Sequence, residues 1–290
     1  MRIGIIGAGK VGVTLGKYLT DAGITVSGFY SRTKTSAAQA ADFVITTLYE
    51  DLKDLVKASD TLFITVPDGE ISNVWDCIAE YDLTDILLCH FSGSLSSNVF
   101  SGIEHTGAAG VSIHPMYAFS DKFTSYQQFH TACLVMEGDS EAVRRMQELF
   151  ADQLGHMVLQ IRTEDKIKYH TAAAMASNYM TALLEVSMRL LSDCGFSDED
   201  SLALLRPLVQ NNVSQMLNVG TVNALTGPVE RGDICTVQKH LDVLQGEPAE
   251  RIYRELGIVL ADLAKRKHPG WDDKKMRQCL RDGGYHEKYN

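Results

Sequence analysis

The chain lacks a surplus of positive charge. Its 290 residues contain 27 lysines and arginines against 37 aspartates and glutamates, which gives a formal net charge of -10 at pH 7. A protein that binds nucleic acid or an anionic membrane as its main partner needs a basic face, so this balance argues against both partners. The acidic bias is interpreted as a property that keeps a cytoplasmic protein soluble.

Other absences exclude further classes of protein. The six cysteines are scattered without a CxxC pair, so we predict reduced, mostly buried thiols. No residues have metal-ligand spacing, since His286-Glu287 lacks the second histidine of an HExxH site. No apolar run approaches the ~20 residues that cross a bilayer. The first residues predict a strand in place of a signal peptide. We therefore expect a soluble, cytoplasmic protein without bound metal.

The most informative pattern lies in the first dozen residues. An apolar run, Ile3 to Ile6, leads into a GxGxxG motif, and a second apolar run compatible with a helix follows. This order is typical of a dinucleotide-binding βαβ unit, in which the glycines permit a sharp turn, close approach of a pyrophosphate and packing of helix on strand. The predicted cofactor-binding residues here are Gly7, Ala8, Gly9, Lys10, Val11 and Gly12.

The tip of the second predicted strand, residues 24–30, indicates which cofactor is bound. NAD-specific sites place an acidic residue there to bind the ribose 2′-hydroxyl. Ser31, Arg32 and Thr33 stand at this tip instead. Hydroxyls and a guanidinium suit a 2′-phosphate, so we predict NADP in preference to NAD. An exposed loop arginine is the alternative interpretation.

Strands and helices alternate over residues 1–161, as a doubly wound Rossmann domain requires. Further strands are predicted at 43–48, 60–68, 86–89, 108–113, 131–136 and 156–161, with helices at 35–41, 70–80 and 140–153. Ligands bind at the carboxyl ends of such strands, which adds Val66, Pro67, Ser92 and Gly93 to the cofactor-binding residues. A serine hydrolase is the competing interpretation of the serines that follow residue 91, but GxSxG is absent.

Residues 162–290 show almost no strand signal and are predicted to form an all-α domain that binds substrate and dimerises. Helices are expected at 165–194, 197–218 with a kink at Pro207, 234–245 and 248–267, and the tail from His268 is expected to be partly mobile. The first of these helices is long and apolar on several faces, which suggests a homodimer interface. Its methionines, Met175, Met180 and Met188, are assigned to the core.

Four stretches resemble one family. They are His90-Phe-Ser-Gly-Ser-Leu-Ser96, Ser112-Ile-His114-Pro115-Met116 with Phe119, Tyr169-His170 with Asn178-Tyr179, and Thr226-Gly-Pro-Val-Glu-Arg231-Gly-Asp233 with His240-Leu241. They are similar to Rossmann-like proteins with a DUF2520 C-terminal domain. The two-domain pattern resembles the wider 6-phosphogluconate dehydrogenase-like superfamily, with pyrroline-5-carboxylate reductase and prephenate dehydrogenase as relatives. The resemblance implies this fold and an NADP- or F420-dependent oxidoreductase, without a settled substrate.

Reduction of a C=O or C=N bond needs a proton donor beside the reacting oxygen or nitrogen. His170 is the first candidate, with Asn178 as an amide that orients the substrate. The alternative is that His170 only packs in a structural role, and the same alternative holds for His114. His114 competes for the donor role, because it is expected just after a strand, in a turn fixed by Pro115. Superfamily relatives often pair a lysine and an asparagine one turn apart, but here Ala174 stands one turn before Asn178. Candidate substrate-binding residues are Thr226, Arg231 and Asp233, with His240 weaker.

The sequence thus predicts an NADP-dependent oxidoreductase that transfers a hydride to or from a small carbonyl or imine, or a hydroxy or amino acid, bound between two domains. A non-catalytic dinucleotide sensor and an F420H2:NADP oxidoreductase are the alternatives. Cofactor binding without turnover would favour the sensor, and a deazaflavin pocket would favour the second.

Overall fold

The computed structural model describes residues 1–281 and consists of two compact units. The first unit is Met1–Ser177, and the second begins at Asn178. The division falls inside the long helix α6 (Lys166–Asp193), not before it. The start of α6 therefore packs with the first unit and can contribute side chains to it.

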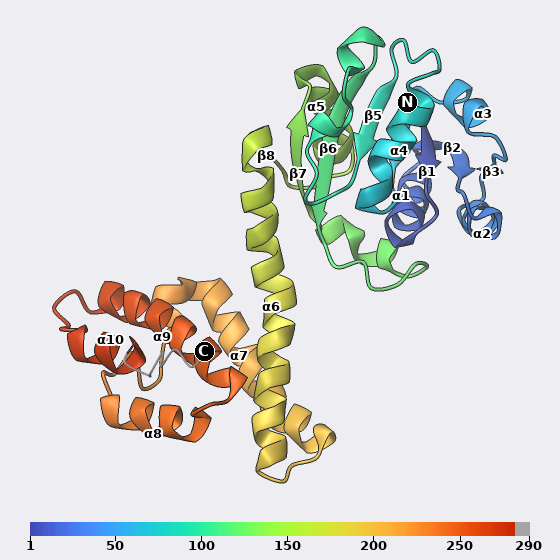
Figure 1. Ribbon diagram of the computed structural model, residues 1–290. Helices are drawn as coiled ribbons and strands as arrows, with labels where there is room; N and C mark the ends of the chain where they lie inside the picture. Colours follow the sequence, from blue (N-terminus) through green and yellow to red (C-terminus); the bar gives the residue numbers. More distant parts are fainter. Residues whose placement is uncertain (282–290) are drawn as a thin grey trace, which may run out of the picture. The chain divides into compact units, whose positions relative to one another are not determined.

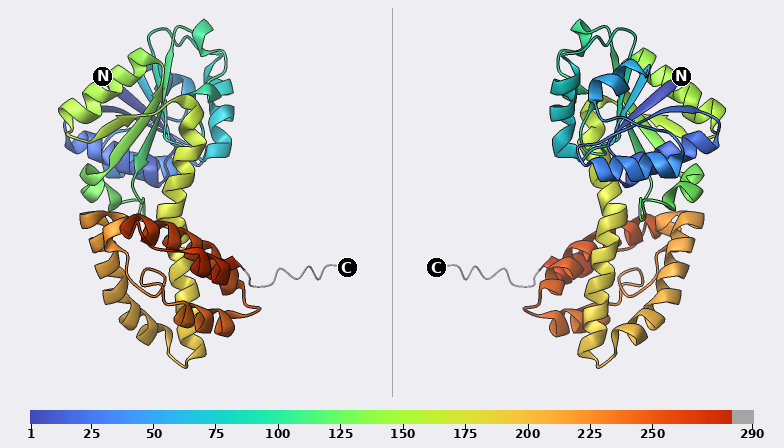
Figure 2. Two further views of the ribbon diagram at one scale, coloured as in Figure 1. Left: turned by 90° about the vertical axis from the view of Figure 1, so that its left-hand side faces the viewer. Right: turned by 90° about the vertical axis from the view of Figure 1, so that its right-hand side faces the viewer.

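The first unit is built on one eight-stranded sheet with the order β3-β2-β1-β4-β5-β6-β7-β8 (Figures 1 and 2). All neighbouring strands are parallel except β6 and β7. The order reverses between β1 and β4, which is the switch point of a doubly wound sheet. The predicted α/β fold is confirmed. The strands are β1 (Arg2–Ile6), β2 (Thr25–Tyr30), β3 (Thr47–Leu48), β4 (Thr61–Ile64), β5 (Leu87–His90), β6 (Ala109–Met116), β7 (Cys133–Gly138) and β8 (Val158–Gln160).

Helices cover both faces of this sheet, which explains why its central strands are almost entirely apolar. Successive strand residues point to opposite faces, so Ile5 packs in one core with α1 and α2, and Ile6 packs in the other with α3 and α4. The helices are α1 (Lys10–Asp21), α2 (Lys34–Val44), α3 (Leu52–Lys57), α4 (Asp68–Ile78) and α5 (Ser140–Gln147), which continues as a π-helix, Glu148–Gln153.

The strand predicted at 43–48 is mostly wrong, because α2 extends through Val44 and only Thr47–Leu48 pair as a strand. Ala37, Ala40 and Val44 recur at helical spacing and are buried against the sheet. Burial of this stripe extends the helix through two residues that were expected to start the strand.

His114 lies inside β6, so the prediction of a turn at Pro115 is also wrong. The last residue of β5, His90, pairs with Ser112, and beyond this point β6 continues against β7 alone. A proline is tolerated where a strand has a neighbour on one side only. The same open side leaves room for His114 at the carboxyl edge of the sheet.

The second unit is helical, as predicted, but two details differ. The helix after α6 contains Pro207 in regular helical geometry, and its break falls at Gly220, where φ is 80°. The tail expected to be mobile from His268 contains a further helix, and its last part, from Asp282 onward, lies outside the described residues. The helices are α7 (Asp198–Ala224), α8 (Ile234–Leu244), α9 (Pro248–Lys267) and α10 (Lys274–Arg281).

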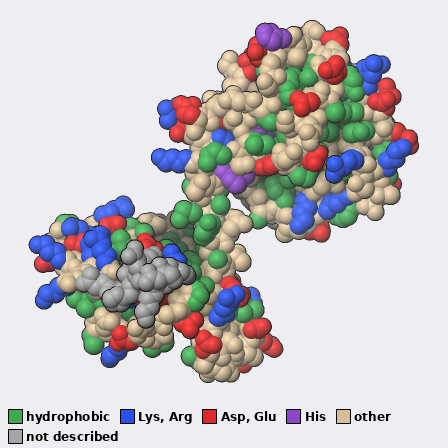
Figure 3. Space-filling view, viewed as in Figure 1, with side chains coloured by type: hydrophobic (Ala, Val, Ile, Leu, Met, Phe, Trp, Pro, Cys, Tyr) green, Lys and Arg blue, Asp and Glu red, His purple; other side chains and the backbone are tan. Residues whose placement is uncertain are grey.

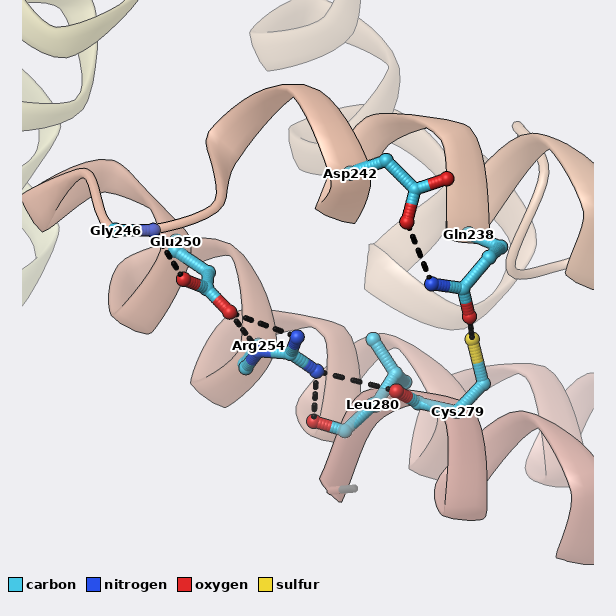
Figure 4. Close-up of polar contacts among 7 residues, drawn as sticks. All are labelled: Gln238, Asp242, Gly246, Glu250, Arg254, Cys279 and Leu280. Carbon is cyan, nitrogen blue, oxygen red and sulfur yellow. Dashed lines mark hydrogen bonds and ion pairs between the residues drawn. The ribbon is translucent and has the colours of Figure 1, made fainter. Parts of the chain in front are cut away.

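Arg254 joins α9 to the end of α10 (Figure 4). Its Nη1 donates hydrogen bonds of 3.1 Å to the carbonyls of Cys279 and Leu280, in the last turn of α10. Its Nε and Nη2 donate to Glu250, whose other oxygen accepts the Gly246 N–H. The guanidinium therefore caps one helix while it is held by another.

The second unit has a small core of its own. Its buried apolar cluster contains six residues, Val229, Val237, Leu241, Ala261, Met276 and Leu280. Within α6 only Lys166 is buried, and within α7 only Ser201. The assignment of Met175 and Met180 to the core is wrong, since they are 59% and 45% exposed. Figure 3 shows hydrophobic side chains at the surface of this unit.

The cysteines and the helix lengths bear on two further predictions. Only Cys89 of the six cysteines is buried, so the prediction of mostly buried thiols is wrong, and no disulfide joins any of them within residues 1–281. None of the helices over residues 1–281 has the length and apolar character that a bilayer crossing requires.

Candidate functional site

The glycine motif forms a tight turn between β1 and α1. Gly7 has φ of 110°, a region that side chains disfavour. A Cβ on Gly12 would overlap the carbonyl of Gly7 and the hydroxyl of Thr65, so the absence of a side chain lets α1 pack on the sheet. A Cβ on Gly9 would meet nothing within 4 Å, which leaves this backbone open to a ligand. The first turn of α1 has no side-chain cap, so its N–H groups can bind an anion.

A cavity of about 430 Å³ lies at this turn, at the carboxyl ends of β1, β2 and β4. Its position is the switch point of the sheet, where ligands bind in this fold. Among the predicted cofactor residues, Lys10, Val11 and Gly12 do not line it, and Ser92 and Gly93 lie at the next strand. The predicted residues that do line it are Gly7, Ala8, Gly9, Ser31, Arg32, Thr33, Val66 and Pro67.

A second group of polar residues lies at the carboxyl ends of β5 and β6. Asp68, in the first turn of α4, accepts hydrogen bonds from the hydroxyls of Ser92 and Ser94, at 2.7 and 2.8 Å. Asp68 directly follows Pro67, which lines the cavity, so this group of polar residues is linked to the cavity wall through the start of α4. The predicted residues Ser92 and Gly93 thus belong to this group.

His114 and His170 converge on the backbone of Gly93. Their ring centroids lie 5.8 Å apart at an angle of 74°. A Cβ on Gly93 would lie 2.5 Å from Cδ2 of His170 and 2.8 Å from Nε2 of His114, so only glycine permits this approach. The structure therefore brings together the two histidines that compete for the donor role, from β6 and from α6.

Tyr169, the residue before His170, orients His114 with its hydroxyl 2.8 Å from Nδ1. Burial, followed by the nearby charge of Lys166, lowers the pKa of His114 to about 4. Burial also raises the pKa of the Tyr169 phenol above its usual value. At neutral pH the pair thus consists of a neutral imidazole and a protonated phenol. If the phenol donates its hydrogen bond to Nδ1, the imidazole carries its proton on Nε2.

Lys166 is a member of this group that was not predicted as a site residue. Its side chain is 1% exposed, and Nζ donates a 2.6 Å hydrogen bond to the hydroxyl of Ser112. Burial lowers its pKa to about 8, while Glu137 and Asp68 act in the opposite direction. A lysine three turns before Asn178 gave no sequence signal, because its burial depends on how α6 packs against β6.

His90 was also missed. It is fully buried at the end of β5, where Nδ1 accepts the N–H of Ser92 at 3.3 Å. Burial, followed by the charge of Lys166, lowers its pKa to about 4. Its sequence signal was its position at a strand end, but only the packed structure shows that it remains neutral and inaccessible.

The remaining candidates lie in the second unit. Asn178 is exposed on α6. Asp233 caps α8, accepting the Thr236 N–H at 3.0 Å, which gives it a structural role; Arg231 beside it is exposed. Thr226 and His240 line a separate, mainly apolar cavity of about 360 Å³, in which Nδ1 of His240 lies 2.8 Å from the hydroxyl of Tyr253.

Within residues 1–281, no three histidine, cysteine or acidic side chains gather in a way that could hold a metal ion. His286-Glu287 lies outside the described residues.

Comparison with known families agrees with this architecture. The Rossmann-like domain matches residues 1–115, and DUF2520, a domain of unknown function, matches residues 132–259. The chain therefore carries a Rossmann-like domain followed by a DUF2520 domain, and the resemblance seen in the sequence is confirmed. No curated protein matches the sequence.

Solved structures share the fold over nearly the whole chain. Protein TM1727 from Thermotoga maritima is 24% identical with a TM-score of 0.73, covering 91% of this chain and 99% of its own. Protein BF3122 from Bacteroides fragilis, described provisionally as an NADP oxidoreductase, is 24% identical with a TM-score of 0.70 and coverage of 90% and 98%. A reductive aminase from Aspergillus terreus, in complex with NADPH and ethyl-5-oxohexanoate, is 16% identical with a TM-score of 0.65 and coverage of 97% and 99%. These likenesses show the fold.

Proposed function

We propose that the protein is an NADP-dependent oxidoreductase that transfers a hydride to or from a small carbonyl or imine substrate. The observation that carries this proposal is the glycine-lined cavity at the switch point of the sheet, together with His114 and His170, which meet at Gly93 just after the neighbouring strand β5. The NADPH complex of the Aspergillus terreus reductive aminase, which shares the fold, supports it.

The residues around the cavity fit a nicotinamide dinucleotide. The open backbone at Gly9 and the uncapped start of α1 suit the pyrophosphate. Ser31, Arg32 and Thr33 would bind the 2′-phosphate of NADP, because all three line the cavity and the Arg32 side chain is 87% exposed. Val66 and Pro67 would lie between this half of the cofactor and the histidines.

The bound cofactor would supply or accept the hydride, and the chain must orient the substrate and move a proton. His170, half-buried beside Gly93, is proposed to give that proton to the substrate oxygen or nitrogen as the carbon receives the hydride. His114 is neutral at pH 7, and its hydrogen bond with Tyr169 at Nδ1 keeps its ring proton on Nε2. Its proposed role is to donate a hydrogen bond from Nε2 to the same substrate oxygen or nitrogen. Asn178, Thr226 and Arg231 remain candidates for substrate orientation.

We also propose that the protein acts as a homodimer through its second unit. The exposed apolar side chains of α6 and α7 include Met180, Leu183, Leu204, Leu208 and Leu217, the last of which is 81% exposed. Because only one of the 28 residues of α6 is buried, packing within this chain stabilises the helix little. Large exposed apolar patches mark interaction sites.

Titration of NADPH and NADH, followed by cofactor fluorescence, tests the proposal on the wild type and on Arg32→Ala. We expect tighter binding of NADPH, which falls in the variant toward the NADH value. A screen of carbonyl and imine substrates with wild type and His170→Ala then tests the chemistry, with loss of turnover and retained cofactor binding expected in the variant. Absence of binding would refute the oxidoreductase, and binding without turnover would favour a nucleotide sensor.

A further inference from the structure

An acidic side chain lies opposite the tip of β2, although the sequence has none at the tip itself. Glu70, in the first turn of α4, lines the same cavity as Ser31 and Arg32. Its Oε2 lies 3.5 Å from Nη1 of Arg32 and accepts a hydrogen bond of 3.4 Å from Asn73. The Glu70 side chain is 40% exposed, so a ligand in the cavity can reach it.

The two charges of this pair favour different cofactors. A guanidinium binds a 2′-phosphate through paired, charge-assisted hydrogen bonds. A carboxylate at the same place accepts a hydrogen bond from a ribose 2′-hydroxyl and repels a phosphate. The fold therefore supplies from α4 the acid that NAD-binding sites carry at the end of β2.

We propose that Glu70 is a specificity-determining residue, which weakens the preference of the site for NADP over NAD. It does so by pairing with Arg32 in competition with the 2′-phosphate and by offering an acceptor to the 2′-hydroxyl of NAD. This inference rests on the proposed function, because it requires a nicotinamide dinucleotide in this cavity.

The neighbouring ion pair provides a matched comparison. Lys34 Nζ lies 3.1 Å from Glu50, and both side chains are exposed, at 71% and 72%. Neither of these two residues lines the cavity. Removing the charge of Glu50 therefore changes the net charge near β2 by the same amount as removing that of Glu70, without touching the proposed ribose site.

Glu70→Gln keeps the size of the side chain and removes its charge. We expect NADPH to bind about three- to tenfold more tightly, because an exposed ion pair and a repulsive contact with phosphate are each of modest strength. NADH should bind equally or up to about threefold less tightly, because an amide is the weaker acceptor. The ratio of the two dissociation constants thus rises, and the rise shrinks at high salt.

Fluorescence titration of both cofactors is to be made on wild type, Glu70→Gln, Glu50→Gln and Arg32→Ala, with thermal unfolding of each. A raised ratio in Glu70→Gln alone supports the inference. An unchanged ratio in Glu70→Gln, or an equal rise in Glu50→Gln, overturns it, and a lowered melting temperature with an unchanged ratio shows that Glu70 contributes to stability only. If Arg32→Ala lowers the ratio while Glu70→Gln does not, this inference fails and the proposed function stands. If wild type binds neither cofactor, both fail.

Discussion

The two units differ in how they bury their apolar residues. In the first unit the sheet is covered on both faces, and two extensive buried clusters contain almost every apolar residue of the central strands. In the second unit the buried cluster has six residues, and two helices of 28 and 27 residues bury one residue each. The first unit can thus be stabilised by its own packing, whereas the second leaves large apolar side chains exposed, which is the basis of the proposed dimer.

A charge on the exposed face of α6 tests this contrast most strongly. Met180→Glu is expected to convert a dimer to a monomer, because a buried unpaired charge costs about 3–5 kcal/mol. Mass by light scattering measures the change. Leu159→Glu, on an exposed residue of the first unit with similar exposure (52% against 45%), should leave the mass unchanged. A monomeric wild type at micromolar concentration would contradict the proposed dimer.

A methyl group in the glycine turn tests the packing of the first unit. Gly12→Ala is expected to destabilise it by about 2–3 kcal/mol, because the new Cβ overlaps Gly7 and Thr65. Gly9→Ala should leave stability nearly unchanged and weaken NADPH binding, since its Cβ points into open space. Urea unfolding and cofactor titration separate the two effects. Equal loss of stability in both variants would show that the turn is not packed as described.

Acid should destabilise the first unit through its buried histidines. Folding lowers the pKa of His90 from 6.5 to about 4. Below pH 6.5, His90 therefore takes up a proton in the unfolded chain while it stays neutral in the folded chain. The folded state thus has its full stability above pH 6.5 and loses stability as the pH falls toward 4. The loss at pH 5 is about 2 kcal/mol for one such histidine.

Urea unfolding of wild type and His90→Asn at neutral and acidic pH measures this loss. The variant should show a shallower decline of stability with acidification. His105→Asn, at a histidine that is 82% exposed, is the control and should decline as the wild type does. The same decline in all three proteins would exclude His90 as the cause.

The smallest effect is expected within the second unit. Arg254→Met keeps an apolar stem but removes the hydrogen bonds to the carbonyls that end α10, which should cost about 1 kcal/mol. Arg251→Met, an exposed position on the same helix, is the control. Thermal unfolding followed by circular dichroism compares them. A larger cost for Arg251→Met would show that Arg254 does not hold the two helices together.

The sequence alone determined the features that depend on local pattern. The glycine spacing between two apolar runs predicted the βαβ turn, and the loss of strand signal after residue 161 predicted the helical part. Local pattern failed where burial decided the outcome, as at α2, which extends through Val44 because its stripe packs on the sheet. It failed at Pro115 for a related reason, because β6 continues past the end of β5.

Tertiary structure alone decided the composition of the site. His114 and His170 were predicted separately, and they meet because α6 begins against β6 and because Gly93 has no side chain. Lys166 and His90 were not predicted as site residues, since their lowered pKa values arise from burial among residues distant in sequence. Likewise, the sequence has no acid at the tip of β2, and only packing brings Glu70 of α4 to 3.5 Å from Arg32. Spacing along a chain specifies turns and periodicity, whereas distances between elements and the dielectric around a side chain exist only after packing.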